Sequence, residues 1–183
     1  IDTKTSDLIA TRPEVEVSGW HSTISADAGY SINGQPIAIS GLDEDVFGEI
    51  YLASLAEGKY PNAANEIAVS SVLKESNDLD LGSVIDLTCP DGSTVSFSIV
   101  GFFDNPEKAR LIAGSEQSVI LAQDGFTTFI SASNSPASEK YIIQLSQHCD
   151  MSSTIEKIKS QYSLSDGQIE ANMNLLNIEG QLA

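Results

Sequence analysis

The sequence predicts an α+β fold in which a β-rich middle stands between two end segments that combine helices and strands. Through the middle, apolar and polar residues alternate with the period of two that a half-buried strand requires. Near both ends, helix-capping residues precede apolar positions at helical spacing. A length of 183 residues allows either one large domain or two small lobes, with a core that needs no disulfide staple.

The N-terminal segment is expected to contain a short helix followed by a strand. The helix spans about residues 5–12, with Ser6 as its cap and Pro13 ending it, because the residue before a proline avoids helical geometry. Alternation then begins at Val15 and continues to Ile24, which predicts a strand.

Turn residues predict two hairpins. Asn33 and Gly34 tolerate the positive φ angles of a two-residue turn, and Pro36 puts the start of the returning strand at an edge or a bulge. The Pro-Asp-Gly triplet at 90–92 is a second turn, and Phe97 points inward from the strand that follows it. Strands are predicted at 66–70, 84–88, 95–99, 117–122, 140–146 and 168–171. Residues 58–64 and 131–136 are expected to be loops.

Three further helical segments are expected along the chain. A helical turn follows the acidic residues 43–45, and a second helix begins at Ser70 or Ser71. The third helix begins with a capping box at 153–156, in which Ser153 and Glu156 satisfy each other's backbone donors. A final apolar segment starts at 175–178.

The composition excludes several classes of protein. Nine Lys and Arg residues stand against 26 Asp and Glu residues, which gives a formal net charge of −17. That charge repels phosphate groups, so neither nucleic acid nor a bare anionic membrane surface is expected as a partner. No apolar run approaches the ~20 residues that span a bilayer, and no signal peptide is visible. Because the chain starts without Met and ends abruptly, we expect it to be a piece of a longer protein.

The charge is also distributed unevenly. Residues 14–58 contain eight acidic residues and no Lys or Arg. A translocated segment of a membrane protein has this bias, because Lys and Arg are retained on the cytoplasmic side. Simple solubility is the alternative explanation.

No pattern of residues predicts a catalytic, cofactor-binding or metal-binding site. Cys149 follows His148 directly, but adjacent side chains of an extended segment point to opposite faces, and His21 is the only other imidazole. The acidic residues 43–45, and the pair Asp78 and Asp80, could bind calcium but lack the spacing of an EF-hand loop. Phosphate-binding loops, nucleophile elbows and zinc-protease helices are absent from the sequence.

The two cysteines leave one question open. In an extracellular protein, Cys89 and Cys149 could form a single disulfide that contributes about 4 kcal/mol through loop closure. The alternative, which we favour, is that each cysteine stays an isolated thiol.

Several short motifs occur in a fixed order. They are SGLD at 40–43 with Phe47, LAEGKYP at 55–61, NEIAVS at 65–70, LGSVIDL at 81–87 and FSIVG at 97–101. Together they resemble the extracytoplasmic core domain of MacB/FtsX-type ABC transporter permeases, over about a third of the chain. On physical grounds, Gly58 and Pro61 bracket a turn into an edge strand. Gly82 gives a left-handed helix end, and Gly101 ends the strand that contains Phe97.

The resemblance implies two lobes between transmembrane helices at the extracytoplasmic face of a bacterial cell membrane. An α/β membrane-proximal lobe would contain residues 1–45 and 111–183, and an inserted β-rich lobe residues 46–110. Ile1 and Ala183 would then both leave the α/β lobe. Such a domain transmits motion, or binds a peptide, lipid or partner, without catalysing a reaction or holding a cofactor. The implied partners are the parent transmembrane helices, a cytoplasmic ATPase subunit or domain and a second permease copy.

Two other functions compete with the transporter hypothesis. A secreted or cell-surface module could bind carbohydrate through Trp20, Tyr30 and Tyr51, because aromatic faces stack on sugar rings. An extracellular hydrolase is the third function, and no nucleophile with a credible base supports it.

Overall fold

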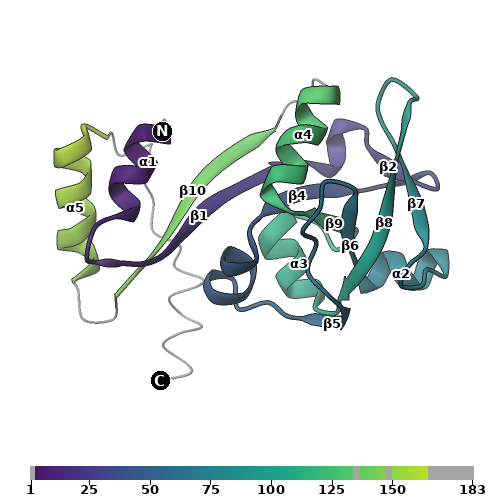
Figure 1. Cartoon of the computed structure of the whole chain (residues 1–183), viewed down its shortest axis with the longest axis horizontal. Helices are drawn as coiled ribbons and strands as arrows, with labels where there is room; N and C mark the ends of the chain where they lie inside the picture. Colours follow the sequence, from purple (N-terminus) through teal and green to yellow (C-terminus); the bar gives the residue numbers. More distant parts are fainter. Residues whose placement is uncertain (1–2, 134–136, 147–149, 165–183) are drawn as a thin grey trace. The chain divides into compact units, whose positions relative to one another are not determined.

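The computed structural model describes residues 3–133, 137–146 and 150–164 of the chain (Figure 1). These form the mixed α+β fold that the sequence predicts, and their strands belong to one curled sheet. The chain divides into two compact units: a smaller one of residues 1–18 and 141–183, and a larger one of residues 19–140. The predicted termini Ile1 and Ala183, and the segments expected at 168–171 and 175–178, lie outside the described residues.

Ten strands form the sheet, in the order β10-β1-β4-β9-β6-β8-β7-β2-β3, with β5 paired to β8. They are β1 (Val15–Ile24), β2 (Ser31–Ile32), β3 (Gln35–Pro36), β4 (Ala38–Leu42), β5 (Leu55–Gly58), β6 (Glu66–Ser70), β7 (Val84–Thr88), β8 (Thr94–Phe103), β9 (Ser118–Leu121) and β10 (Ser138–Leu145). The helices are α1 (Thr3–Ala10), α2 (Ser71–Asn77), α3 (Pro106–Ala113), α4 (Gln123–Ser133) and α5 (Met151–Tyr162), with a 3₁₀ turn η1 (Ala26–Ala28) and a π-helix η2 (Val46–Ile50).

The centre of the larger unit joins strands from distant parts of the sequence. Strand β4 is parallel to β9, β9 is antiparallel to β6, and β6 is parallel to β8. The turn at 58–61 was expected to lead into an edge strand, but the next strand, residues 66–70, is paired on both sides and lies inside the sheet. These pairings join residues 38–42 and 118–121 to 66–70 within the larger unit. The division into an α/β lobe of 1–45 and 111–183 and a β-rich lobe of 46–110 stays a prediction, as does its arrangement relative to a membrane.

Both predicted hairpins are confirmed. Asn33 and Gly34 have φ angles of 49° and 80° and connect β2 to β3, which lies at the end of the sheet as Pro36 requires. In the second turn, Gly92 has a φ of 88°, and its backbone N–H donates to the carbonyl of Cys89 at 2.9 Å. Strands β7 and β8 then pair antiparallel without a register shift, from Val84 opposite Ser98 to Thr88 opposite Thr94.

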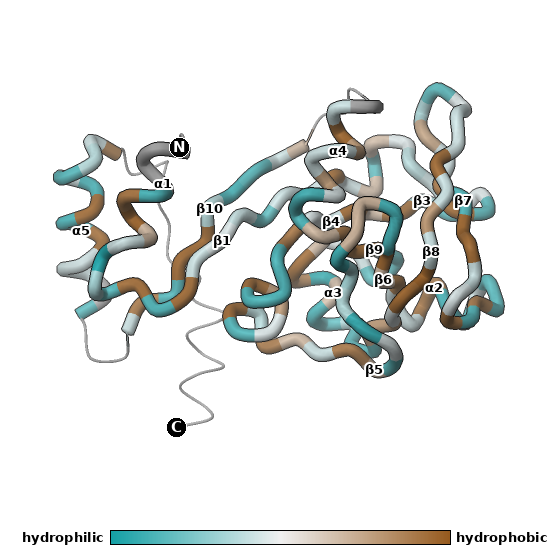
Figure 2. Tube along the Cα trace, in the orientation of Figure 1, coloured by the Kyte–Doolittle hydropathy of each residue, from teal (hydrophilic) through white to brown (hydrophobic). Residues whose placement is uncertain are grey.

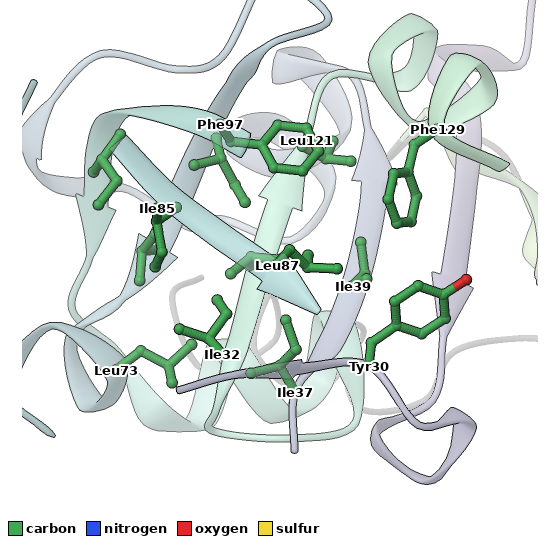
Figure 3. Close-up of a cluster of buried hydrophobic side chains, with 14 of the residues drawn as sticks. Tyr30, Ile32, Ile37, Ile39, Leu73, Ile85, Leu87, Phe97, Leu121 and Phe129 are labelled. Atoms are coloured by element: carbon green, nitrogen blue, oxygen red, sulfur yellow. The ribbon is translucent and has the colours of Figure 1, made fainter. Parts of the chain in front are cut away.

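The hydrophobic core of the larger unit collects the inward residues of these strands. Figure 3 shows side chains from β2, β4, β7, β8 and β9 converging with two aromatic rings, Tyr30 and Phe129. Phe97 is 3% exposed and packs at 6.0 Å, centroid to centroid, from Phe129, so its inward direction is confirmed.

Helices α3 and α4 are absent from the sequence-based prediction, and both cover the sheet. Residues 131–133, predicted to be loop, form the last turn of α4. Phe126 of α4 packs so closely on β4 that a Cβ at Gly41 would lie 2.3 Å from its side chain. Asn105 caps the start of helix α3, because its side chain accepts a hydrogen bond from the backbone of Lys108 at 3.0 Å. The Asn-Pro pair at 105–106 was a usable signal for this start.

Two glycine assignments need correction. Strand β8 passes through Gly101 and ends at Phe103, and a Cβ at Gly101 would lie 2.5 Å from the carbonyl oxygen of Lys59. This glycine therefore permits a close backbone approach and does not end the strand. Asp78, with a φ of 52°, caps the end of α2 after Asn77. Gly82 is left-handed as predicted, with a φ of 84°, but it is a turn residue beyond the helix end.

In the smaller unit, α1 and α5 each bury one stripe. Ile9 of α1 is 3% exposed, and Thr154 and Ile158 of α5 are buried, while hydrophilic residues alternate with them along α5 (Figure 2). Asp150 caps α5 by accepting from the backbone of Ser152 and Ser153, so the predicted cap at Ser153 is wrong. Among the described residues, no helix is both long and apolar enough to cross a membrane.

Candidate functional site

The most distinctive polar group is a buried histidine on strand β1. His21 is 5% exposed, and its Nδ1 lies 2.7 Å from the hydroxyl oxygen of Tyr51, which directly follows η2. Its Nε2 lies 3.2 Å from the hydroxyl of Thr23, two residues along the same strand. Each ring nitrogen therefore has a hydroxyl group within hydrogen-bond distance.

Burial controls the ionisation of this pair. Desolvation lowers the pKa of His21 to about 4, and the positive charge of Lys140 acts in the same direction, while a hydrogen bond with the backbone of Ile112 opposes them. Desolvation also raises the pKa of the Tyr51 hydroxyl. At neutral pH the imidazole is uncharged and the phenol keeps its proton. This arrangement suits a structural hydrogen bond between two neutral groups.

The predicted Cys and His candidates are not brought together in the described residues. His148 and Cys149 lie outside them, so the pair of neighbours remains untested. The partners of His21 are Tyr51, Thr23 and the backbone of Ile112, and none of them is a carboxylate that could orient it as a base. Cys89 is a buried free cysteine, which fits the isolated-thiol alternative for that residue.

The acidic stretches lie at the surface of the larger unit. Asp43, Glu44 and Asp45 are exposed before η2, and Asp78 and Asp80 are exposed after α2. Desolvation, followed by the charges of Asp124 and Asp45, raises the pKa of Asp43. Within the described part of the chain, no group of three His, Cys, Asp or Glu side chains could hold a metal ion.

The aromatic residues do not form an exposed platform. Tyr30 and Tyr51 are only 1% and 4% exposed, and their rings pack against Phe129 and His21. Trp20 is half-buried on β1. Sugar stacking needs open aromatic faces, so the carbohydrate alternative loses two of its three predicted contacts.

The smaller unit carries a shallow, open depression of about 520 Å³. Its lining consists of polar and charged residues from α5 and the segment after α1: Arg12, Glu156, Lys157, Ser160 and Gln161. Arg12 is already occupied there by an ion pair with Glu14 at 3.3 Å and a hydrogen bond to Gln161. The depression therefore presents no free cluster with an obvious chemical function.

Sequence reasoning missed the contact between His21 and Tyr51. The two residues are 30 positions apart and belong to a strand and a loop whose pairing no local pattern encodes. It also missed Leu52, which has a φ of 55° although it is not a glycine. Neither feature leaves a signal in residue spacing.

No sequence-family profile and no curated protein sequence matches this chain. Solved structures do match it. The periplasmic region of MacB from Actinobacillus actinomycetemcomitans has a TM-score of 0.63 at 8% identity, covering 88% of this chain and 72% of that one. This chain has the fold of the MacB-like periplasmic domain. The extracellular domain of YknZ, a noncanonic ABC-type transporter from Gram-positive bacteria, matches with a TM-score of 0.63 at 9% identity, covering 91% and 86% of the two chains.

A third solved structure is also similar in fold to this chain. A domain of a putative permease protein from Porphyromonas gingivalis has a TM-score of 0.53 at 14% identity, covering 81% of this chain and 65% of that one. The fold predicted from the short motifs at 40–103 is thus confirmed, and the first two matches extend well beyond those motifs, over 88% and 91% of this chain.

Proposed function

We propose that this chain is a non-catalytic extracytoplasmic domain of an ABC transporter permease, which transmits motion or binds a substrate or partner outside the membrane. The observation that carries the proposal is the match to the YknZ extracellular domain, because it covers 91% of this chain and 86% of that domain. Residues 14–58 contain no Lys or Arg, which supports an extracytoplasmic location for the domain.

The proposed partners follow from this role. The parent transmembrane helices and a cytoplasmic ATPase subunit or domain would drive the motion, and a second permease copy would complete the transporter. Peptides or lipids are the ligand classes we propose at the outer face. The domain itself would bind no nucleotide, since its charge of −17 disfavours phosphate groups.

A cysteine-labelling experiment on the full-length gene product in intact cells tests the location. Glu75 is exposed on α2, so we replace it with cysteine in a background where Cys149 is serine. A membrane-impermeant maleimide should label Glu75→Cys before lysis. The matched control is the same background without Glu75→Cys. Cys89, the remaining cysteine of these 183 residues, is buried, so the control reports any labelling that does not come from position 75.

Labelling of Glu75→Cys only after lysis would place the domain in the cytoplasm and contradict the proposal. A role in transmission is tested separately, by measuring the ATPase rate of the assembled permease with and without the domain. Unchanged ATPase rate and transport after deletion of the domain would exclude both motion transfer and substrate binding.

A further inference from the structure

We propose that residues 46–52, the η2 segment, form a clamp on strand β1 at the point where β1 passes from one unit to the other. The division between the two units falls within β1, between Ser18 and Gly19. All the contacts that form the clamp lie within the larger unit, directly after this point. The inference goes beyond the proposed function, because it concerns how the chain controls the stiffness of its own connecting strand.

The first contact of the clamp is between Gly19 and Val46. A Cβ at position 19 would lie 2.5 Å from Cγ2 of Val46, so only glycine allows the η2 segment to approach this closely. Val46 is fully buried, which shows that the approach is a packed contact. Glycine inside a strand often marks such a close approach.

The second contact is the hydrogen-bonded pair of His21 and Tyr51. His21 follows Gly19 by two residues, so both positions face the same side of β1. The hydroxyl of Tyr51 lies 2.7 Å from Nδ1 of His21, and the two rings meet edge to face at 5.3 Å between centroids. The η2 segment therefore holds β1 at two successive positions of one face.

The two contacts are linked through the backbone of the π-helix. The N–H of Tyr51 donates to the carbonyl of Val46 at 3.0 Å, so the residues that touch β1 are joined by one π-type turn. This hydrogen bond therefore fixes the backbone of Tyr51 relative to that of Val46. Single π turns are uncommon and occur frequently at functional sites.

The residue after Tyr51 is strained, which makes the clamp releasable. Leu52 has a φ of 55°, a left-handed conformation that disfavours a residue with a Cβ. Its side chain is 41% exposed, so its own burial does not explain the conformation. The neighbouring contacts hold it, namely the Tyr51 pair before it and the hydrogen bond from Ala53 N–H to the Phe47 carbonyl after it. Loss of the Tyr51 contact therefore lets this segment relax away from β1.

Hydrogen exchange of the 183-residue chain, followed by mass spectrometry, tests the clamp. Tyr51→Phe keeps the ring and removes the hydroxyl. We expect amide exchange about five-fold faster in residues 19–24 and 46–53, the effect of losing one net hydrogen bond on a local opening. The hairpin at 84–99 should exchange at the wild-type rate and serves as the internal control.

A compensating pair of variants gives an independent test. Gly19→Ala should accelerate exchange in residues 46–53, because the new methyl group displaces Val46. Adding Val46→Ala removes the clashing Cγ2, so the double variant should exchange more slowly in this segment than Gly19→Ala alone. Purely additive effects would show that Gly19 and Val46 are not coupled and would overturn the proposal.

For Tyr51→Phe, two results would overturn the proposal. One is unchanged exchange in residues 19–24. The other is acceleration at 84–99 equal to that at 19–24, in step with a lower global unfolding free energy, which would make the hydrogen bond a general stabiliser only. These measurements need neither a membrane nor an ATPase, so their outcome is separate from that of the labelling experiment.

Discussion

Lowering the pH from 7.5 to 5 should destabilise the folded chain through one buried imidazole. His21 is 5% exposed, and desolvation, with a contribution from Lys140, lowers its pKa from an ordinary value of 6.5 to about 4. In the unfolded chain the imidazole is solvated and recovers its ordinary pKa. Between these two values the unfolded state binds a proton that the folded state does not.

The size of the effect follows from the difference in pKa. Each pKa unit corresponds to about 1.4 kcal/mol, so a shift from 6.5 to about 4 sets a limit of about 3 kcal/mol. The stabilisation is complete above pH 6.5 and decreases as the pH falls toward 4. At pH 5 the loss should already be about 2 kcal/mol, before most carboxylates begin to bind protons.

Urea unfolding of the wild type and of His21→Asn, at both pH values, isolates this contribution. Asparagine places an amide near the position of Nδ1, so it can still meet the Tyr51 hydroxyl, but it does not titrate. Asp43, whose pKa is raised by burial and by nearby carboxylates, acts in the opposite direction. It is present in both proteins, so its effect cancels in the comparison. The wild type should lose about 2 kcal/mol more than the variant between the two pH values.

An equal loss of unfolding free energy in both proteins would refute the reasoning. It would mean that His21 keeps an ordinary pKa in the folded state, which requires access of water to its ring. Direct titration of the His21 ring protons by NMR would show the same result as a midpoint near 6.5 instead of about 4.

Three further predictions concern packing and capping. Phe97→Ala should lower the unfolding free energy by about 3–5 kcal/mol in urea titrations, because the ring is 3% exposed, and an unchanged melting temperature would contradict its burial. Gly41→Ala should destabilise the chain by about 1–3 kcal/mol, since its Cβ would lie 2.3 Å from Phe126, and a neutral result would mean that α4 can shift. Asn105→Ala should cost about 1 kcal/mol by removing the cap of α3, whereas Asn105→Asp should keep most of the stability.

The sequence by itself determined the features that depend on neighbouring residues. The turn at Asn33 and Gly34, the cap at Ser70 and the alternation along β1 follow from φ preferences, side-chain donors and a period of two, which operate over a few residues. The starting signal of α3, an asparagine before a proline, is equally local. Short motifs in the right order also pointed to the correct fold, although they cover only a third of the chain.

Only the tertiary structure decided which segments meet. The turn at 58–61 was expected to lead into an edge strand, yet the next strand, residues 66–70, pairs with β8 and β9 and lies inside the sheet. Tyr51 looked like an exposed aromatic, yet it is buried against His21 across 30 residues of sequence. The physical reason is that strand pairing and side-chain burial depend on surfaces assembled from distant segments. The free energy of these contacts outweighs the weak local preferences that a sequence pattern reports.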